Sequence, residues 1–423
     1  TGIKSIGIYS EGAAVNQNGT STVGQTGTGI YTKGGSVTLG AASIVSIGQN
    51  EAVGVYGTNG TLVTNNSTNF SVGNGGYGFV LESNSALNNN TAINLTGKGT
   101  GVYSDGTNTV TSIAGADINM TGDNNIGYYL VNGGTVTNSA DINGTSGESN
   151  IGIYAKGSGT SVVNSGEINA VSSGKIKGIA VTDNADITNT KNIKLNGQSG
   201  SVGIYASNYG TFTSSGTGDV DIKVSGTDSV GIYSENNGLV AVNGNIEAAD
   251  NAINLYASNG KILLTDAALT TKANSLLFYM TNNGKFSLTN TQADIENSGA
   301  AFYYDASSLG AITSGIMSGY ISNMFLSGSN SVLNMSQDSI LVSVNNADVN
   351  LSNLPDLRTT LGSVGINVSG TGYKSYLLYL HYDKHFLFSA ASAAIIPYGG
   401  LSSSGKPSAV CRFIECPCSK PCF

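Results

Sequence analysis

Apolar and polar residues alternate in three short bursts within the stretch NIGIYAKGSGTSVVNSGEINAVS, residues 150–172. The bursts are NIGIY, TSVVN and GEINAV, and the segment AKGSG separates the first two. Alternation with a period of two is typical of a half-buried β-strand, whereas Gly and Ser favour turns. The pattern therefore predicts three strands. In the first strand it places Ile151 and Ile153 on one face, and Gly152 and Tyr154 on the other.

The same order of bursts recurs along the chain, and the tyrosine of the first burst marks each repeat. Neighbouring members of this tyrosine series are 22 to 28 residues apart, except for two gaps near fifty residues. Val80 and Ala180 stand where the missing tyrosines are expected. The period is therefore about 25 residues. The series comprises Tyr9, Tyr31, Tyr56, Tyr103, Tyr129, Tyr154, Tyr205, Tyr233, Tyr256, Tyr279 and Tyr304.

Stacked repeats of this kind predict the fold. Three short strands per period, joined by Gly, Asn and Ser turns and stacked on the next period, form a right-handed parallel β-helix. This all-β prediction covers residues 1–370. It gives roughly fifteen rungs and a rod about 70 Å long at the usual strand spacing. No helical period competes with the alternation in the first 370 residues.

Glycine stands two residues before the tyrosine in eight periods, so alternation predicts both residues on the outward face. A tyrosine ring over a bare glycine backbone would shield the strand hydrogen bonds from water. We therefore predict a solvent-facing tyrosine stripe with glycines beneath the rings. These glycines are Gly7, Gly29, Gly54, Gly101, Gly127, Gly152, Gly203 and Gly231.

Composition narrows the classes of function. Charged residues make up 10% of the chain and Gly numbers 59, and the strand-forming residues Ile, Val, Thr and Tyr are abundant. A protein with a net charge of −8 does not neutralise phosphates, so we expect no nucleic-acid partner. No apolar run reaches the length of about eighteen residues that predicts a membrane helix.

Residues 371–423 differ in composition from the repeats. They contain both His, all four Cys and four of the five Pro, whereas Asn, which is abundant before them, is absent. A short capping segment and a metal or disulfide knot are two interpretations of this tail. The cysteine spacing matches no zinc motif, so we expect no metal site and no cofactor, and we favour an unstructured or out-of-frame segment. The residues concerned are His381, His385, Cys411, Cys416, Cys418 and Cys422.

The repeated G-[IV]-Y phrases and stretches such as GGTVTNSADING, residues 133–144, resemble the passenger domains of large autotransporter adhesins of type V secretion. The most similar group is fusobacterial, and the resemblance covers about residues 1–370. It implies a virulence-associated β-helical stalk on the cell surface that binds host cells or other bacteria. It also implies an outer-membrane β-barrel at the C-terminus. Since no barrel follows and Thr1 lies within a repeat phrase, we interpret the chain as a passenger fragment.

Polysaccharide-degrading enzymes also use β-helices, and their sites need clustered carboxylates with a basic partner. No Arg precedes Arg358 and no His lies in the repeats, so we expect no enzyme and no catalytic residue. A column of acids on the third strand alternates with Ile, which predicts a solvated face, with a cation ladder as the alternative. The column comprises Asp117, Asp141, Glu167, Asp221 and Asp294, interrupted by Asn192, Asn245 and Ala268.

The outward tyrosines are the candidate for ligand binding, because aromatic stripes stack on sugar rings or serve as protein contacts. The alternative is that the stripe only protects the stacked strands, and its presence in nearly every period favours this. We expect an adhesive stalk whose ligand is a glycan or a protein. A purely structural stalk and a β-helical lyase or hydrolase are the alternatives. The candidate residues are Tyr103, Tyr129, Tyr154, Tyr205 and Tyr233.

Overall fold

The chain was analysed as a computed structural model, and its described part contains β-strands and turns and no helix. All ladders between named strands are parallel, as in the pairs β1–β4 and β38–β40. The all-β prediction is therefore confirmed. The structure describes residues 4–171, 174–214, 220–282, 284–296 and 299–305, together with 324–327, 332–335, 340–345, 365–368 and 376–381.

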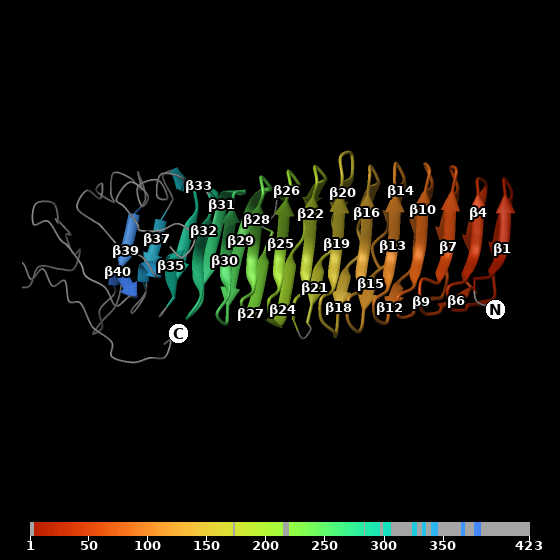
Figure 1. Cartoon of the computed structure of the whole chain (residues 1–423), viewed down its shortest axis with the longest axis horizontal. Helices are drawn as coiled ribbons and strands as arrows, with labels where there is room; N and C mark the ends of the chain where they lie inside the picture. The colour runs from red at the N-terminus through yellow and green to blue at the C-terminus, as the bar shows by residue number, and fades with distance from the viewer. Residues whose placement is uncertain are drawn as a thin grey trace, which may run out of the picture.

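The strands stack along one axis as a solenoid (Figure 1). Each turn begins with a strand of the 15-stranded first sheet. The strands of this sheet are β1 (Ile6–Glu11), β4 (Thr28–Lys33), β7 (Val53–Thr58), β10 (Tyr77–Glu82), β13 (Thr100–Asp105), β16 (Ile126–Val131), β19 (Ile151–Lys156), β22 (Lys177–Thr182), β25 (Val202–Ser207), β28 (Val230–Glu235), β30 (Ile253–Ser258), β32 (Leu276–Thr281), β35 (Ala300–Asp305), β38 (Ile340–Asn345) and β40 (Tyr376–His381).

Two further ladders complete each turn and belong to a 25-stranded sheet. The second ladder consists of β2 (Ala14–Gln17), β5 (Ser36–Leu39), β8 (Leu62–Asn65), β11 (Ala86–Asn89), β14 (Thr109–Ser112), β17 (Thr135–Asn138), β20 (Ser161–Asn164), β23 (Asp186–Asn189), β26 (Thr211–Ser214), β29 (Leu239–Ala249), β31 (Lys261–Thr271), β33 (Lys285–Thr289) and β36 (Met324–Ser327). The third consists of β3 (Thr20–Val23), β6 (Ile44–Ile47), β9 (Asn69–Val72), β12 (Ile93–Leu95), β15 (Ile118–Met120), β18 (Ile142–Gly144), β21 (Ile168–Ala170), β24 (Ile193–Ser199), β27 (Ile222–Thr227), the second halves of β29 and β31, β34 (Gln292–Ile295), β37 (Val332–Met335) and β39 (Gly365–Val368).

Three short strands per turn, as predicted, are observed from β1 to β27. The first sheet contributes one strand to each turn and has 15 strands, in line with the roughly fifteen rungs predicted. Strands stack one per turn at about 4.8 Å, so the turn count sets the length of the rod.

The cross-section changes after β28, where the second and third strands merge. β29 and β31 are each 11 residues long, and the ladder between them is irregular from Asn243 to Asn245 around Gly244. The glycine that precedes the tyrosine is replaced in the next turn by Asn254, which is fully buried. Its Nδ2 donates to the carbonyl oxygens of Ile246 and Thr270, both at 3.0 Å. A polar side chain therefore occupies the space between the sheets in this turn.

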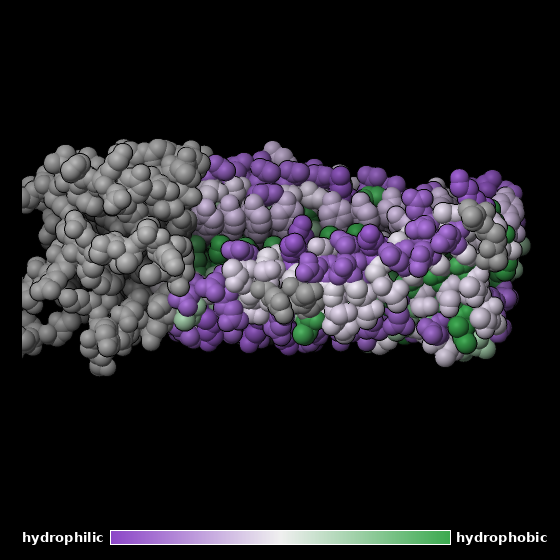
Figure 2. Space-filling model, turned by 60° about the horizontal axis from the view of Figure 1, so that its bottom comes forward, coloured by the Kyte–Doolittle hydropathy of each residue, from purple (hydrophilic) through white to green (hydrophobic). Residues whose placement is uncertain are grey.

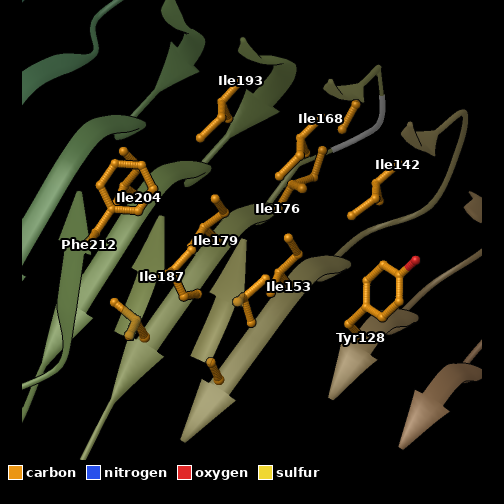
Figure 3. Close-up of a cluster of buried hydrophobic side chains, with 14 of the residues drawn as sticks. Tyr128, Ile142, Ile153, Ile168, Ile176, Ile179, Ile187, Ile193, Ile204 and Phe212 are labelled. Atoms are coloured by element: carbon orange, nitrogen blue, oxygen red, sulfur yellow. The ribbon is translucent and has the colours of Figure 1, made fainter. Parts of the chain in front are cut away.

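Inward side chains of all three strands form one continuous hydrophobic core along the axis. Figure 3 shows two rows of isoleucines in which members of successive turns lie over one another. One row includes Ile142, Ile168 and Ile193, which are Cα partners in successive turns and at most 1% exposed. Each turn therefore buries its apolar residues mainly against the turns before and after it.

The first strand departs from simple alternation. In β19, Gly152 and Ile153 are both buried, whereas Ile151 and Tyr154 are half-buried. The ladder to β22 pairs the residues on either side of Gly152 but not the glycine itself. The prediction that Ile151 and Ile153 share a face is therefore wrong. Two successive residues turn inward because the first of them has no side chain to place.

The glycine series lies against the core and not beneath the tyrosine rings, so that prediction is also wrong. A Cβ atom added at Gly203 would lie 2.5 Å from the carbonyl oxygen of Gly231 and 2.9 Å from Cγ2 of Ile222. The same contact with the carbonyl one turn on, at 2.4 to 2.7 Å, recurs along the column. Glycine is needed because backbone and core isoleucine fill this space. The column comprises Gly7, Gly29, Gly54, Gly78, Gly101, Gly127, Gly152, Gly178, Gly203 and Gly231.

The visible surface is mostly hydrophilic or neutral, with small separate apolar areas (Figure 2). Among the described residues, no helix has the length and hydropathy needed to cross a membrane. Of the predicted tail, residues 371–423, the structure describes β40, which pairs in parallel with β38. His385 and the four cysteines lie outside the described residues.

Candidate functional site

The five candidate tyrosines lie in one column on the outer face of the first sheet. Tyr103, Tyr129 and Tyr154 are Cα partners in successive turns, and Tyr205 pairs with Tyr233. All five side chains are half-buried. The structure thus brings together the residues that the repeat predicted as a stripe.

The register of the first sheet also tests the last member of the tyrosine series and its two gaps. Val80 pairs with Tyr56 and Tyr103, and Ala180 pairs with Tyr154 and Tyr205, as the spacing predicted. The last member is wrong by one residue, because Tyr279 pairs with Tyr303 and not with Tyr304.

The rings of the column contact one another, but their geometry varies along the rod. Tyr233 and Tyr256 are stacked, with centroids 4.4 Å apart and planes 7° apart. Tyr103 and Tyr129 meet edge to face at 5.3 Å and 90°, and Tyr129 and Tyr154 at 5.0 Å and 69°. Both arrangements are favourable for aromatic pairs. Each of these rings therefore contacts at least one neighbouring ring of the column.

Carboxylates at the end of the first strand accept hydrogen bonds from the tyrosine hydroxyls. Tyr103 donates to Oδ2 of Asp105 at 3.4 Å. Glu235 accepts from two neighbouring turns, since Tyr205 donates to its Oε1 and Tyr233 to its Oε2. These bonds fix the rotation of the rings and tie adjacent turns together on the outer face.

Burial and these carboxylates shift the tyrosine pKa values upward. Burial raises the pKa of Tyr103 to about 12, and the charge of Asp105 adds to the effect. Burial likewise raises the pKa of Tyr205 to about 12, with a contribution from its hydrogen bond to Glu235. The pKa of Tyr233 rises further, from burial first and Glu235 second. A negative tyrosinate in this column is disfavoured by low solvation and by the adjacent carboxylate.

We expect alkaline pH to destabilise the solenoid through these tyrosines. Their folded pKa values lie above the unfolded value of about 10, so the stability they contribute is complete below that pH. It is lost as pH rises through the folded value of about 12 for Tyr205. Urea unfolding measured at a series of pH values should therefore show a falling free energy of unfolding in this window.

The substitution Glu235→Gln should move the titration of Tyr205 and Tyr233 to lower pH, because it removes the neighbouring negative charge. Ultraviolet absorbance of tyrosinate during alkaline titration measures this shift. Glu51→Gln is the matched control, since Glu51 is an exposed carboxylate in the turn before β7 and lies outside the tyrosine column. Equal titration curves for the two variants would contradict the role of Glu235.

The acids of the third strand connect neighbouring turns through backbone hydrogen bonds. The backbone N–H of Asp141 donates to Oδ1 of Asp117 at 3.1 Å, and that of Glu167 donates to Oδ1 of Asp141 at 2.8 Å. Asn192 takes the same role by accepting from the backbone N–H of Asp221 at 2.9 Å. Since an amide oxygen serves as well as a carboxylate, the column needs an acceptor and not a charge.

Asp294 does not belong to this column, although the sequence placed it there. The ladder sets Gln292 opposite Ala268, and Asp294 opposite Thr270. The two-residue offset follows from the variable turn lengths, which spacing alone does not resolve. Within the described part of the chain, no group of three or more His, Cys, Asp or Glu residues is placed to hold a metal ion.

The core contains a ladder of buried asparagines that the sequence did not lead us to predict. Nδ2 of Asn138 donates to Oδ1 of Asn164 at 2.7 Å, and Nδ2 of Asn164 donates to Oδ1 of Asn189 at 2.6 Å. Asn164 also donates to the carbonyl of Gly166 at 2.7 Å, and all three asparagines are 0% exposed. Its sequence signal is the phrase TVTN, where alternation turns the Asn inward with the Val two residues earlier.

Ser112 stands in the asparagine ladder where an Asn would continue it, and Tyr128 reaches this point from the opposite side of the core. The hydroxyl of Tyr128 donates to Oγ of Ser112 at 2.7 Å and lies 2.9 Å from Oδ1 of Asn138. Tyr128 takes a position that holds Val102 and Ile153 in the neighbouring turns. The larger side chain therefore fills the space and supplies the hydrogen bonds that an Asn would otherwise make.

Comparison with known proteins identifies no family for this chain. No protein-family model matches it, and the search of curated proteins found no match. Among solved structures it matches the TibC-catalyzed hyper-glycosylated TibA55-350 fragment with 12% sequence identity and a TM-score of 0.24, covering 81% of this chain and 99% of the fragment. Similarity this low identifies neither a family nor a function.

Proposed function

We propose that this chain is part of an autotransporter passenger and acts as a rigid adhesive stalk on the bacterial cell surface. The observation that carries the proposal is the unbroken stack of parallel strands around a single core. A stack of this kind resists bending because each turn is bonded to its neighbours along three ladders. The resemblance of the G-[IV]-Y phrases to fusobacterial adhesin passengers supplies the proposed class, type V secretion and an outer-membrane anchor.

Adhesion by such a rod is multivalent. Equivalent side chains recur at each turn, about 4.8 Å apart along the axis. Contacts that are individually weak therefore act together when the rod lies against a surface that carries many copies of a ligand. The ligand of the proposed adhesin is a glycan or a protein on host cells or on other bacteria.

An enzymatic function is not part of the proposal. An enzymatic function would have to use the acid column of the third strand. These acids are engaged in hydrogen bonds between turns, as between Asp141 and Glu167. A polysaccharide lyase or hydrolase also needs a base or acid with a matched pKa beside the scissile bond. Assays for reducing or unsaturated sugar products on acidic polysaccharides should therefore show none.

Surface display tests adhesion directly. The full chain, presented on a non-adherent bacterium, should increase attachment to epithelial cells or to partner bacteria over a strain that displays only the anchor. Detection by antibody shows that equal amounts of folded chain reach the surface. Attachment equal to that of the anchor strain would contradict the adhesin and favour a purely structural stalk whose binding region lies elsewhere.

A further inference from the structure

The two gaps in the tyrosine column are filled in different ways. At Val80, the ring of Tyr77, three residues earlier, meets Tyr103 edge to face at 6.1 Å. At Ala180, the residue three positions earlier is Lys177, whose Nζ lies 5.1 Å from the centroid of the Tyr205 ring. An aromatic ring therefore fills the first gap, whereas a flexible cation covers the second.

The spacing at Ala180 is that of a column with one ring missing. Tyr154 and Tyr205 both pair with Ala180, so they stand two ladder steps apart, or about 9.6 Å. Directly neighbouring rings of the column have centroids 4.4 to 5.6 Å apart. A six-membered ring inserted between Tyr154 and Tyr205 would therefore lie one ladder step from each, close to the separation that the column uses elsewhere.

Two carboxylates and two lysines lie around this gap, and Glu235 is already held by the hydroxyls of Tyr205 and Tyr233. Lys156 on the neighbouring turn is paired with Asp183 at 3.5 Å. Among the described residues Lys177 makes no ion pair, and its ammonium rests on the Tyr205 ring. A cation–π contact at a partly exposed site is weak, so a carboxylate can draw the ammonium away. Ala180 is 2% exposed, so side chains lie over it until they are displaced.

We propose that the gap at Ala180 binds the ring of an acidic sugar, stacked between Tyr154 and Tyr205 with its carboxylate paired to Lys177. The proposal rests on the adhesive function and names the ligand class for it. Sialic acids of host glycans and uronic acids of bacterial polysaccharides share this chemistry, a pyranose ring that bears a carboxylate. Sugar faces stack on aromatic rings, and the Lys177 charge selects acidic over neutral sugars.

Saturation-transfer NMR on the full chain tests the site with three probes: N-acetylneuraminic acid, glucuronic acid and glucose. At least one acidic sugar should bind at least tenfold more tightly than glucose, and the acid that binds distinguishes a host source from a bacterial one. Ala180→Tyr completes the column and should abolish binding. Val80→Tyr, at the gap that Tyr77 already fills, is the matched control and should bind as the unchanged chain does.

Lys177→Met keeps the apolar stem and removes the charge, so it should lose the preference for acidic sugars even if Ala180→Tyr does not fold. Circular dichroism checks the fold of each variant. Equal binding by the folded Ala180→Tyr variant, or no binding of either acid by the unchanged chain, would overturn the site. If the site is absent but the chain still mediates adherence in the display assay, only the sugar site is contradicted. If the chain binds the sugar but does not mediate adherence, only the adhesive function is contradicted.

Discussion

Replacing Gly203 by Ala is expected to lower the free energy of unfolding by about 3 kcal/mol, at the upper end of the range for overpacked cores. The added Cβ would lie 2.5 Å from the carbonyl oxygen of Gly231 and 2.9 Å from Cγ2 of Ile222. The first contact is with backbone, which is held in place by the ladder between β25 and β28. Two turns must therefore move apart to admit one methyl group. Urea unfolding followed by circular dichroism measures the loss.

Gly19→Ala is the matched control for this change. Gly19 is exposed, and a Cβ there would meet nothing within 4 Å. Its substitution should change the free energy of unfolding by less than about 0.5 kcal/mol. If the two variants unfold at the same urea concentration, the close approach of the glycine column does not limit stability. Since turns of a solenoid unfold with partial independence, the loss should be largest in signals from the turns around β25.

Asn164→Leu is expected to destabilise the core by about 3 kcal/mol or more, since each buried polar group left without a partner costs about 1–3 kcal/mol. The substitution leaves Oδ1 of Asn189, the carbonyl of Gly166 and one Nδ2 proton of Asn138 without their partner. Leucine has the same branched arrangement of four side-chain heavy atoms as asparagine, but its methyl groups are larger, so overpacking adds to the loss of hydrogen bonds. Differential scanning calorimetry should show a lower unfolding temperature.

The exposed Asn88 provides the control for the ladder. Its side chain points away from the core at the equivalent outward position of β11, next to the buried Asn89. Asn88→Ala should leave the unfolding temperature close to that of the unchanged chain. An Asn164→Leu variant as stable as Asn88→Ala would show that the buried amides contribute no net stability.

The repeat made the solenoid predictable, because one phrase with a tyrosine anchor fixes both the period and the register. Tyr129 and Tyr154 pair as the spacing required. The orientation of single residues was less predictable. Gly152 turns inward because the carbonyl of Gly178 and the Ile168 side chain occupy the space beside it. That arrangement depends on the position of the next turn, and alternation within one strand does not contain it.

In the candidate site, too, the positions of the residues were predictable from the repeat, whereas contacts between turns were not. The column of tyrosines follows from the sequence, and so do its gaps at Val80 and Ala180. The contact between Lys177 and the Tyr205 ring needs the stacking of two turns that are 28 residues apart at these positions. The misplacement of Asp294 has a related cause, since variable turns shift a column by two residues without changing its local pattern.

The in-register columns have a consequence for how such a gene can change. Gly127, Gly152 and Gly178 repeat the same backbone contact with the turn that follows each of them. After a recombination event that removed or duplicated one whole repeat, the flanking turns would still stack with equivalent residues in register. Each event would shorten or lengthen the molecule by about 4.8 Å, the spacing of one strand. The length of the rod can therefore vary among descendants in small steps while every remaining turn keeps its packing.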